Sequence, residues 1–408
     1  MSIQHKCPRC GGVDVIKNGS GRRMCKNAKC SYHGAAKFFL PESDQEKQKA
    51  ESEQSLRRRI ENLEAQNKAL AKESFEMAAI RRLVNGIAGK VNNESPAWVH
   101  KVPFKQGKII HGIPTLMLSD LHFGEVVFEN QVGGVNSYNT EIAKRRLSRV
   151  VHGSVKYLRE TLSPGHFGGA VCLLGGDMMD GVIHDELRDT ADETVMQSVI
   201  TLHDELVPHL KALCDEFGQL FVVAVAGNHG RLDRKPRAKN RAALNFDWLL
   251  YQFIQRTINA DPKYKHRVTF MIPDGTDASY RVHNVRYMLT HGDKFTGGNG
   301  ITGPLLPWMR GDMKSRKQYG AMKQPYDTLV MGHWHQLRFL EGIIVNGCLP
   351  GFDEYSMRMG YGFEPPQQAL WVTSPVRGIT ISEGIWGDEA PQAVESEWLS
   401  IRSPIVKK

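Results

Sequence analysis

The sequence predicts a mixed α/β body preceded by a small cysteine-rich module and a helical segment. Apolar runs of strand length alternate with stretches of helical composition along residues 96–408, and several of these runs end in a polar residue flanked by glycine. Upstream, four of the seven cysteines lie within the first thirty residues. We therefore expect three domains, with residues 1–40 forming the module, 41–95 the helical segment and 96–408 the body.

Composition places the chain among soluble globular proteins. It has 408 residues, of which 41% are hydrophobic and 24% charged. No run approaches the roughly 18 consecutive apolar residues that a membrane span requires, and the first ten residues lack the apolar core of a secretory signal. Cys172, Cys214 and Cys348 are scattered, as is typical of reduced thiols. We expect a cytoplasmic protein without a membrane partner.

The basic charge is concentrated at the N-terminal end. The whole chain carries a formal charge of +9, and residues 1–110 alone hold 21 Lys and Arg against 11 Asp and Glu. The remainder is close to neutral. Such an asymmetry favours a polyanionic partner, with nucleic acid as the first candidate. The alternative is a solvated basic surface that binds nothing.

Four cysteines form two closely spaced pairs, Cys7 with Cys10 and Cys25 with Cys30. Two thiolate pairs on tight turns complete a tetrahedral structural zinc site, and a module of about forty residues needs the metal to fold. His5 or His33 is an alternative ligand for one position. The remaining alternative is four unrelated reduced thiols.

The surrounding pattern, CPRCGG followed by VIKNG, RRMCKNAKC and KFF, resembles the zinc ribbon at the start of many transposases and DNA-associated proteins. The resemblance covers about forty residues and implies one structural Zn²⁺ and contact with nucleic acid. The phosphate contacts that it implies are Lys17, Arg22, Arg23, Lys26, Lys29 and Lys37.

Residues 43–90 have a strongly helical composition. A heptad seam runs through Leu56, Ile60, Leu63, Asn67, Leu70, Ser74 and Met77 and is interrupted at Arg81. The pattern predicts a short coiled coil that forms a homo-oligomer through residues 50–85. A single helical arm packed on the body is the alternative.

In the body we expect helices at residues 140–161, 184–217 and 244–258, with a break at Pro208 in the second. The expected strands after the one that ends near Leu118 are 170–174, 220–226, 268–272, 280–283, 285–290, 328–331, 342–345 and 370–372. The glycine-rich segment 296–304 is expected to lack a following helix, which excludes a phosphate-binding loop there.

Polar residues follow five of these strands, and glycine flanks most of them. They are Asp120, His122, Asp177, Asn228, His291, His333 and His335. Strand ends of an α/β sheet gather such residues into one site. Mixed nitrogen and oxygen donors suit Mn²⁺, with Fe or Zn²⁺ as alternatives, better than Mg²⁺ or Ca²⁺. The set is large enough for two divalent cations.

The motifs DxH, GDxxD, GNH, H and GHxH, in this order over residues 113–350, resemble those of the calcineurin-like metallophosphoesterases. The resemblance implies a four-layer αββα sandwich and a metal-dependent phosphoric ester hydrolase. It assigns Asp120, His122 and His335 to the first metal, and Asn228, His291 and His333 to the second. It makes Asp177 the bridging ligand, His229 the catalytic group, and Asp180 a supporting acid.

One position departs from the family's pattern. Gly230 stands where an acid usually follows the GNH histidine, and that acid would orient the imidazole. Our hypothesis is that Asp233, three residues later, replaces it.

The loop that follows the GNH motif favours a polyanionic substrate. Residues 231–241 carry six cations, among which Arg231, Arg234, Lys235 and Arg237 are the candidate phosphate contacts. We expect a phosphodiesterase that acts on nucleic acid. The alternatives are a phosphomonoesterase on phosphoprotein or small molecules, and a DNA-binding scaffold with a vestigial site. A solvated basic loop is the plainer interpretation of the cations.

Overall fold

The computed structural model describes two compact units, Met1–Arg82 and Leu83–Lys408. The described residues are 7, 9–10, 15–17, 23–27, 30, 33–34, 54–55, 57–62, 94–100, 112–161, 167–181, 183, 185–296 and 303–389. The expected domain boundaries after residues 40 and 95 stay predictions. No helix in these ranges has the length and apolar character to cross a bilayer.

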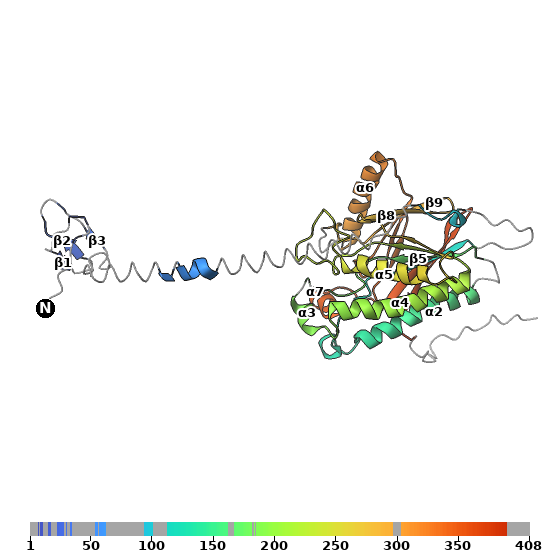
Figure 1. The fold of residues 1–408 in the computed structure, drawn as a ribbon, viewed down its shortest axis with the longest axis horizontal. Coiled ribbons are helices and arrows are strands. Elements are labelled where there is room, and N and C mark those ends of the chain that lie inside the picture. The colour runs from blue at the N-terminus through green and yellow to red at the C-terminus, as the bar shows by residue number, and fades with distance from the viewer. Residues whose placement is uncertain are drawn as a thin grey trace, which may run out of the picture. The chain divides into compact units, whose positions relative to one another are not determined.

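The first unit contains a small antiparallel sheet of three strands in the order β1-β2-β3 (Figure 1). The strands are β1 (Val15–Lys17), β2 (Arg23–Cys25) and β3 (His33–Gly34). Residues 54–55 and 57–62 are helical, and their side chains are exposed, including Ile60 of the predicted seam. Most of the predicted coiled coil lies outside the described residues, so the homo-oligomer stays a prediction.

The second unit contains two sheets. The six-stranded sheet has the order β14-β13-β4-β5-β6-β7, in which β4 to β7 are parallel and β13 and β14 are antiparallel. Its strands are β4 (Ile113–Leu118), β5 (Ala170–Leu174), β6 (Leu220–Ala224), β7 (Val268–Met271), β13 (Gln367–Ser374) and β14 (Gly378–Trp386).

The five-stranded sheet has the order β11-β12-β10-β9-β8, with β9, β10 and β12 parallel. Its strands are β8 (Asp277–Val282), β9 (Val285–Thr290), β10 (Thr328–Met331), β11 (Arg338–Leu340) and β12 (Ile343–Val345). Its parallel strands point the ligand-bearing loops after β9 and β10 toward one edge.

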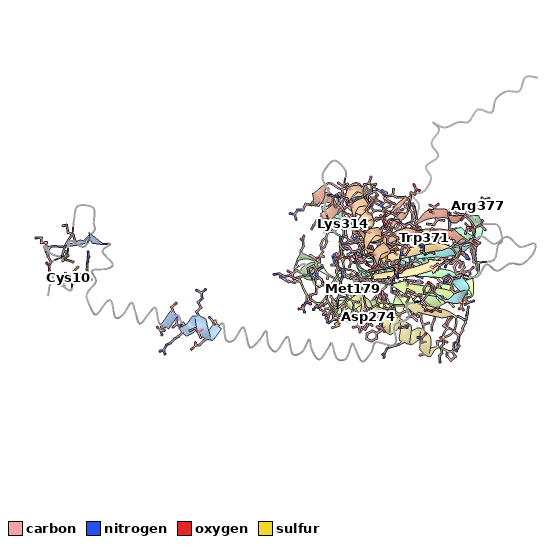
Figure 2. The ribbon with its side chains drawn as sticks, turned by 90° about the horizontal axis from the view of Figure 1, so that it is seen from above. Cys10, Met179, Asp274, Lys314, Trp371 and Arg377 are labelled. Carbon is pink, nitrogen blue, oxygen red and sulfur yellow. The ribbon has the colours of Figure 1, made fainter. Side chains whose placement is uncertain are left out.

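The alternation of side chains along the strands produces four layers. Met117 of β4 and Trp371 of β13 pack with Tyr287 and Val330 of the other sheet, and Trp371 is labelled in Figure 2. Leu116 and Leu118, on the opposite face of β4, pack in the cluster that contains the buried residues of the helices α2 (Thr140–Thr161), α4 (Val195–Phe217) and α5 (Phe246–Ala260). These helices share one side of the body in Figure 1.

The helix α6 (Leu305–Ala321) covers the outer face of the five-stranded sheet, where Trp308 packs against Leu329 and Met331. It lies on the side of the body opposite to α2, α4 and α5 (Figure 1). Both sheets are therefore covered, and the predicted αββα sandwich is confirmed.

Two local predictions were wrong. Pro208 lies inside α4 without ending it, because the neighbouring Leu206, Val207 and Leu210 are buried and hold the helix in place. The break comes earlier, between α3 (Asp185–Thr190) and Thr194, which caps α4.

A helix also follows the glycine-rich segment, contrary to the expectation, since α6 begins at Leu305. Pro307 falls in its first turn, where proline is tolerated. The short elements η2 (Ala97–Val99), η3 (Glu129–Gln131) and α7 (Glu354–Met359) complete the described body.

Candidate metal centre

Five strand ends bring the predicted ligands together. Asp120 and His122 follow β4, Asp177 follows β5, and Asn228 follows β6, all in the six-stranded sheet. The other sheet contributes His291 after β9, and His333 and His335 after β10. Residues that were chosen from the sequence over a span of more than two hundred positions thus meet at one edge.

The backbone at these positions is strained. Asp120, His122, Asp177, His333 and His335 all have a positive φ, between 46° and 70°, although none is glycine. Only three other non-glycine residues in the described ranges share this conformation. A left-handed backbone at a non-glycine residue costs free energy and persists where the surrounding fold imposes it, which is common at functional sites.

The first group of three consists of Asp120, His122 and His335, whose ligand atoms lie within 4.8 Å of one another. The Nε2 atoms of His122 and His335 are 3.2 Å apart, and His335 Nε2 lies 3.5 Å from Asp120 Oδ1. His122 Nδ1 faces Asp180 Oδ1 at 3.3 Å and donates to it, so Nε2 presents a lone pair. Lone pairs that face one another in this way fit a shared cation.

The second group of three consists of Asp177, His291 and His333. His291 Nδ1 donates to the carbonyl of Gly175 at 2.9 Å, so Nε2 is the nitrogen that faces the other ligands. That atom lies 2.9 Å from Asp177 Oδ2 and 3.0 Å from Asn228 Oδ1, which are both acceptors. Two oxygens this close to Nε2 require a positive charge among them, either a proton on the ring or a bound metal ion, so this group also fits a metal ion.

The pKa shifts of these residues also indicate that the site requires positive charge. Burial lowers the pKa of His291, but the Asp177 carboxylate outweighs it and raises that pKa to about 10. Burial raises the pKa of Asp177, yet His291 and His229 hold it well below its usual range. By contrast, burial and the charge of His291 lower the pKa of His333 to about 4, which leaves a neutral imidazole suited to coordination.

Asp177 is the residue that both halves of the site share. Its carboxylate belongs to two clusters of ligand atoms. One contains His122 and His229, and the other contains His291 and His333. This position suits the bridging role that the motifs predict, because a carboxylate has two oxygens to offer.

His229 is oriented by Asp180 and not by Asp233. His229 Nδ1 lies 2.8 Å from the Asp180 carbonyl, to which it donates, and 3.2 Å from Asp180 Oδ1. The Asp233 carboxylate is paired with Arg237 instead, so our hypothesis for Asp233 was wrong. No acid fits at Gly230, where a Cβ atom would lie 2.4 Å from Asn245 Oδ1.

Glycines beside the ligands make room for carboxylates. A Cβ atom on Gly227 would lie 2.1 Å from Asp177 Oδ1, and one on Gly332 would lie 2.2 Å from Asp120 Oδ2. Both distances are far below van der Waals contact, so these positions require glycine.

Two supporting groups were missed by the sequence reasoning. Asp247, fully buried in the first turn of α5, accepts hydrogen bonds from the backbone amides of Asp177, Met178 and Gly227. It thereby fixes the loops after β5 and β6 relative to each other. An acid in the first turn of a helix is an ordinary N-terminal residue, so nothing in the sequence distinguished it.

The second group is a buried polar network behind Asp120. Ser119 Oγ donates to Asp120 Oδ2 at 2.5 Å, and Asn346 Nδ2 donates to both Ser119 Oγ and Gln368 Oε1. All of these side chains are fully buried. The network joins β4 to β12 and β13 and orients the Asp120 carboxylate toward the ligands.

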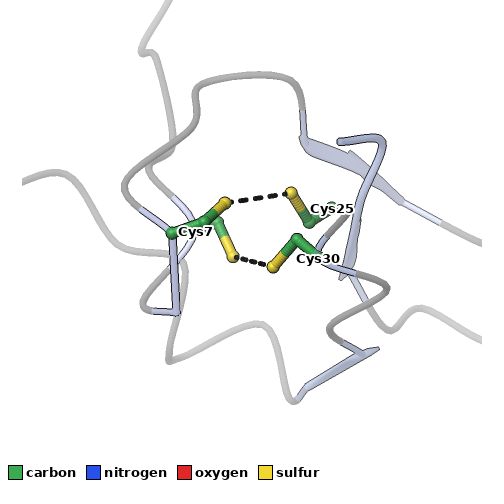
Figure 3. A group of neighbouring side chains, drawn as sticks. Cys7, Cys25 and Cys30 are labelled. Atoms are coloured by element: carbon green, nitrogen blue, oxygen red, sulfur yellow. Dashed lines mark hydrogen bonds between the residues drawn. The ribbon is translucent and has the colours of Figure 1, made fainter. Parts of the chain in front are cut away.

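The four N-terminal cysteines also meet. Cys7 and Cys30 have sulfur atoms 3.7 Å apart, those of Cys10 and Cys25 are 3.6 Å apart, and all four lie within 4.8 Å of one another (Figure 3). Tetrahedral zinc with Zn–S bonds of about 2.3 Å places sulfurs roughly 3.8 Å apart. The cluster is therefore compatible with the predicted structural zinc.

The basic loop adjoins the metal ligands. Arg231, Lys235, Arg237 and Arg241 line a surface hollow together with Asn228. Arg231 donates to the backbone carbonyls of Asn228, Asp233 and Arg234, so its guanidinium braces the loop. Arg234, Lys235 and Arg237 are exposed.

Comparisons with known proteins return structures of low similarity. A Vps29 single mutant from Entamoeba histolytica is 12% identical, with 67% of this chain and 99% of that chain covered and a TM-score of 0.27. A dimetal phosphatase from Danio rerio is 11% identical, with 68% and 99% covered and a TM-score of 0.31. A putative 5'-nucleotidase from Staphylococcus aureus is 10% identical, with 70% and 56% covered and a TM-score of 0.28.

No family model matches the chain, and no curated protein matches it either. Similarities this low do not decide the family, and the motifs and the site geometry carry more weight. The order of the ligands along the chain, and the αββα sandwich that gathers them, agree with the calcineurin-like metallophosphoesterase superfamily that the motifs resemble.

Proposed function

We propose that this chain is a metal-dependent phosphoesterase that hydrolyses phosphodiester bonds of nucleic acid. The observation that carries the proposal is the convergence of six carboxylate and imidazole donors on two adjacent groups joined by Asp177, with Asn228 in contact with His291 as the seventh donor. Two divalent cations, when bound there, would neutralise phosphoryl oxygens and make a water more acidic. Mixed imidazole and carboxylate ligands favour Mn²⁺, Fe or Zn²⁺ at these positions.

Asp120, His122 and His335 would hold one cation, and Asn228, His291 and His333 the other. His229 would act on the reacting ester. Its ring lies 4.6 Å from that of His122, and its Nδ1 proton is directed to the Asp180 carbonyl, so Nε2 would be the atom that acts on the substrate. A proton held at Nε2 would pass to the leaving oxygen.

The basic loop favours a phosphodiester within a nucleic-acid chain over an isolated phosphomonoester as the substrate. Lys235 and Arg237 line the hollow beside Asn228, where phosphates that flank the scissile bond would pass. Among the residues that the structure describes, Arg237 pairs with the partly exposed Asp233, and a surface ion pair of this kind is weak enough for a phosphate to displace. Arg234, Lys235 and Arg237 are thus the proposed phosphate contacts, and Arg231 positions them.

The cysteine module would supply a second contact with nucleic acid. It carries much of the positive charge of the chain and folds around its proposed zinc. Binding through phosphates would be strongly salt-dependent.

The test is hydrolysis by the full chain after metal removal with EDTA and reconstitution with Mn²⁺, Fe²⁺ or Zn²⁺. The substrates are single- and double-stranded DNA, RNA, and aryl phosphomonoesters and phosphodiesters. Metal-dependent cleavage of a nucleic acid and of the aryl diester supports the proposal. Cleavage of the aryl monoester alone would establish a phosphomonoesterase, and no hydrolysis with any metal would indicate a scaffold.

A further inference from the structure

An exposed aromatic surface lies near the loops that carry the metal ligands. Its rings are not part of the hydrophobic core, so packing of the core does not explain why they are aromatic. The helix α7 buries none of its side chains, and residues 357–363 are exposed without interruption. Tyr355 of α7 is 60% exposed, and in the segment that follows Tyr361 is 46% and Phe363 58% exposed. We call these three rings the aromatic platform. Large apolar side chains that gather at the surface mark a binding site more often than chance exposure.

The platform is ordered by local hydrogen bonds. The Asp353 carboxylate caps α7 by accepting from Ser356 N at 2.7 Å, and Tyr361 N donates to the Ser356 carbonyl at 2.9 Å. The turn between them uses Gly360 with a φ of 67°, as at many helix C-termini. Arg338 pairs with Glu364 just beyond Phe363. The rings are thus presented to solvent on a preformed backbone.

The rings occur in two contacting pairs. Tyr355 and Tyr361 meet edge to face with centroids 6.0 Å apart, while Phe363 lies 5.6 Å from the half-buried Phe352. Phe352 packs against the main core and anchors the second pair. Beyond these contacts Tyr355, Tyr361 and Phe363 stay exposed.

The platform adjoins the loops that carry the first group of ligands. Glu354 accepts a hydrogen bond from Phe128 N at 2.7 Å, and residues 123–128 directly follow His122. On the other side, Leu349 N donates to the Asp120 carbonyl at 3.0 Å. Tyr355 follows six residues later, so its Cα atom lies at most about 20 Å from that of Leu349, the reach of a fully extended chain. A few nucleotides span this distance.

We propose that the aromatic platform stacks unpaired bases of a single-stranded nucleic acid whose scissile phosphate lies at the metal centre. The inference rests on the proposed function and specifies its substrate as unpaired. Aromatic rings bind unpaired bases of any sequence through their faces, whereas bases in a duplex are already stacked. The exposed Arg358 in the last turn of α7 offers a cation to the backbone that connects such bases.

A nucleic acid fits the platform better than a protein partner. Its three rings are exposed, and Glu354 in the same segment accepts a hydrogen bond from the loop that follows His122, near which the substrate would pass. The basic loop supplies phosphate contacts beside Asn228, a ligand of the second group. Aromatic faces together with basic groups are the usual composition of single-strand binding surfaces.

The test compares the full-length wild type with Tyr361→Ala and Phe363→Ala, with Tyr361→Trp as the conservative variant and Phe253→Ala as a control. Phe253 is an exposed aromatic residue on α5. One probe is a single-stranded oligonucleotide that contains 2-aminopurine, whose fluorescence falls on stacking. The others are its duplex, and an aryl phosphodiester too small to reach the platform.

The wild type is expected to quench the single-stranded probe and to bind it more tightly than the duplex. Each alanine variant should weaken single-strand binding and raise its KM at least about fivefold, the loss of one stacked base. Aryl diester hydrolysis should stay within about twofold, and Tyr361→Trp should restore quenching. Phe253→Ala should behave as the wild type.

Three results would overturn the inference. The first is equal binding of the single strand by the wild type and the alanine variants. The second is a wild-type dimer that Tyr361→Ala converts to a monomer in sedimentation, since the platform would then be a self-association surface. The third is a parallel loss of aryl diester hydrolysis. Quenching is measured without turnover, so failure of the hydrolytic proposal would be seen separately, as base stacking without cleavage.

Discussion

Asp180 holds His229 through two contacts with the same nitrogen, since its carbonyl and its Oδ1 atom lie 2.8 Å and 3.2 Å from His229 Nδ1. The same Oδ1 atom also lies 3.3 Å from Nδ1 of His122. One buried acid therefore orients a predicted metal ligand and the predicted catalytic histidine together. We therefore expect Asp180 to take the role that the family's pattern gives to the acid missing at Gly230.

Asp180→Asn should reduce turnover about 10- to 100-fold, the usual cost of losing a group that orients a ligand. The measurement is kcat on an aryl phosphodiester at saturating Mn²⁺, together with metal content by mass spectrometry. Asp233→Asn is the matched control, because its carboxylate pairs with Arg237 outside the ligand groups. Equal effects of the two variants on kcat would refute the assignment to Asp180.

Gly227→Ala should abolish stoichiometric metal binding. The new Cβ atom would lie 2.1 Å from Asp177 Oδ1 and 2.3 Å from the Asp177 backbone nitrogen, which cannot move away because Asp247 holds it. Metal content after dialysis measures the effect. Gly275→Ala is the control, since its Cβ atom would have no neighbour within 4 Å. Full metal occupancy in Gly227→Ala would show that the site does not need this close approach.

His209→Leu should remove part of the acid sensitivity of the fold. Burial, together with the charge of His152, lowers the pKa of His209 to about 4. The unfolded chain binds a proton at this position near pH 6.5, so stability that is present above that pH is lost as the pH falls toward 4. The loss amounts to about 3 kcal/mol at most.

The measurement for His209 is the urea midpoint at pH 7 and at pH 4.5. The difference between the two should be smaller in His209→Leu than in the wild type. The same change at the exposed His266 serves as the control and should leave the difference unaltered. An identical pH dependence in wild type and His209→Leu would contradict the prediction.

Cys25→Ser should remove one zinc ion per chain and weaken salt-sensitive binding of nucleic acid. Burial raises the pKa of the Cys7 thiol, but the backbone amides of Arg9 and Cys10 outweigh it and bring that pKa to about 7, which favours the thiolate that zinc requires. Aryl diester hydrolysis should stay within about twofold of the wild type. Cys214→Ala, in the body, should retain the zinc. Zinc retained in Cys25→Ser would exclude the four-cysteine site.

Much of the fold could be predicted because its signals are local. The apolar runs at residues 170–174, 285–290 and 328–331 coincide with β5, β9 and β10, since their length and their flanking glycines are strand properties. The helix α6 was missed because Pro307 and two glycines obscure its helical pattern, while its stability comes from Trp308 packed on the second sheet. Packing of this kind has no local signal.

The same division applies to the site. Asp120, His122, Asp177, Asn228, His291, His333 and His335 were selected from the sequence alone, because polar residues after apolar strands carry their own signal. Only the tertiary structure decided which residues support them. Asp180 rather than Asp233 orients His229, and Asp247 fixes the loop of Asp177 from 70 positions away. The sequence determined which residues are the donors. The fold determined their mutual distances and their neighbours, because contacts between distant segments depend on how the two sheets pack.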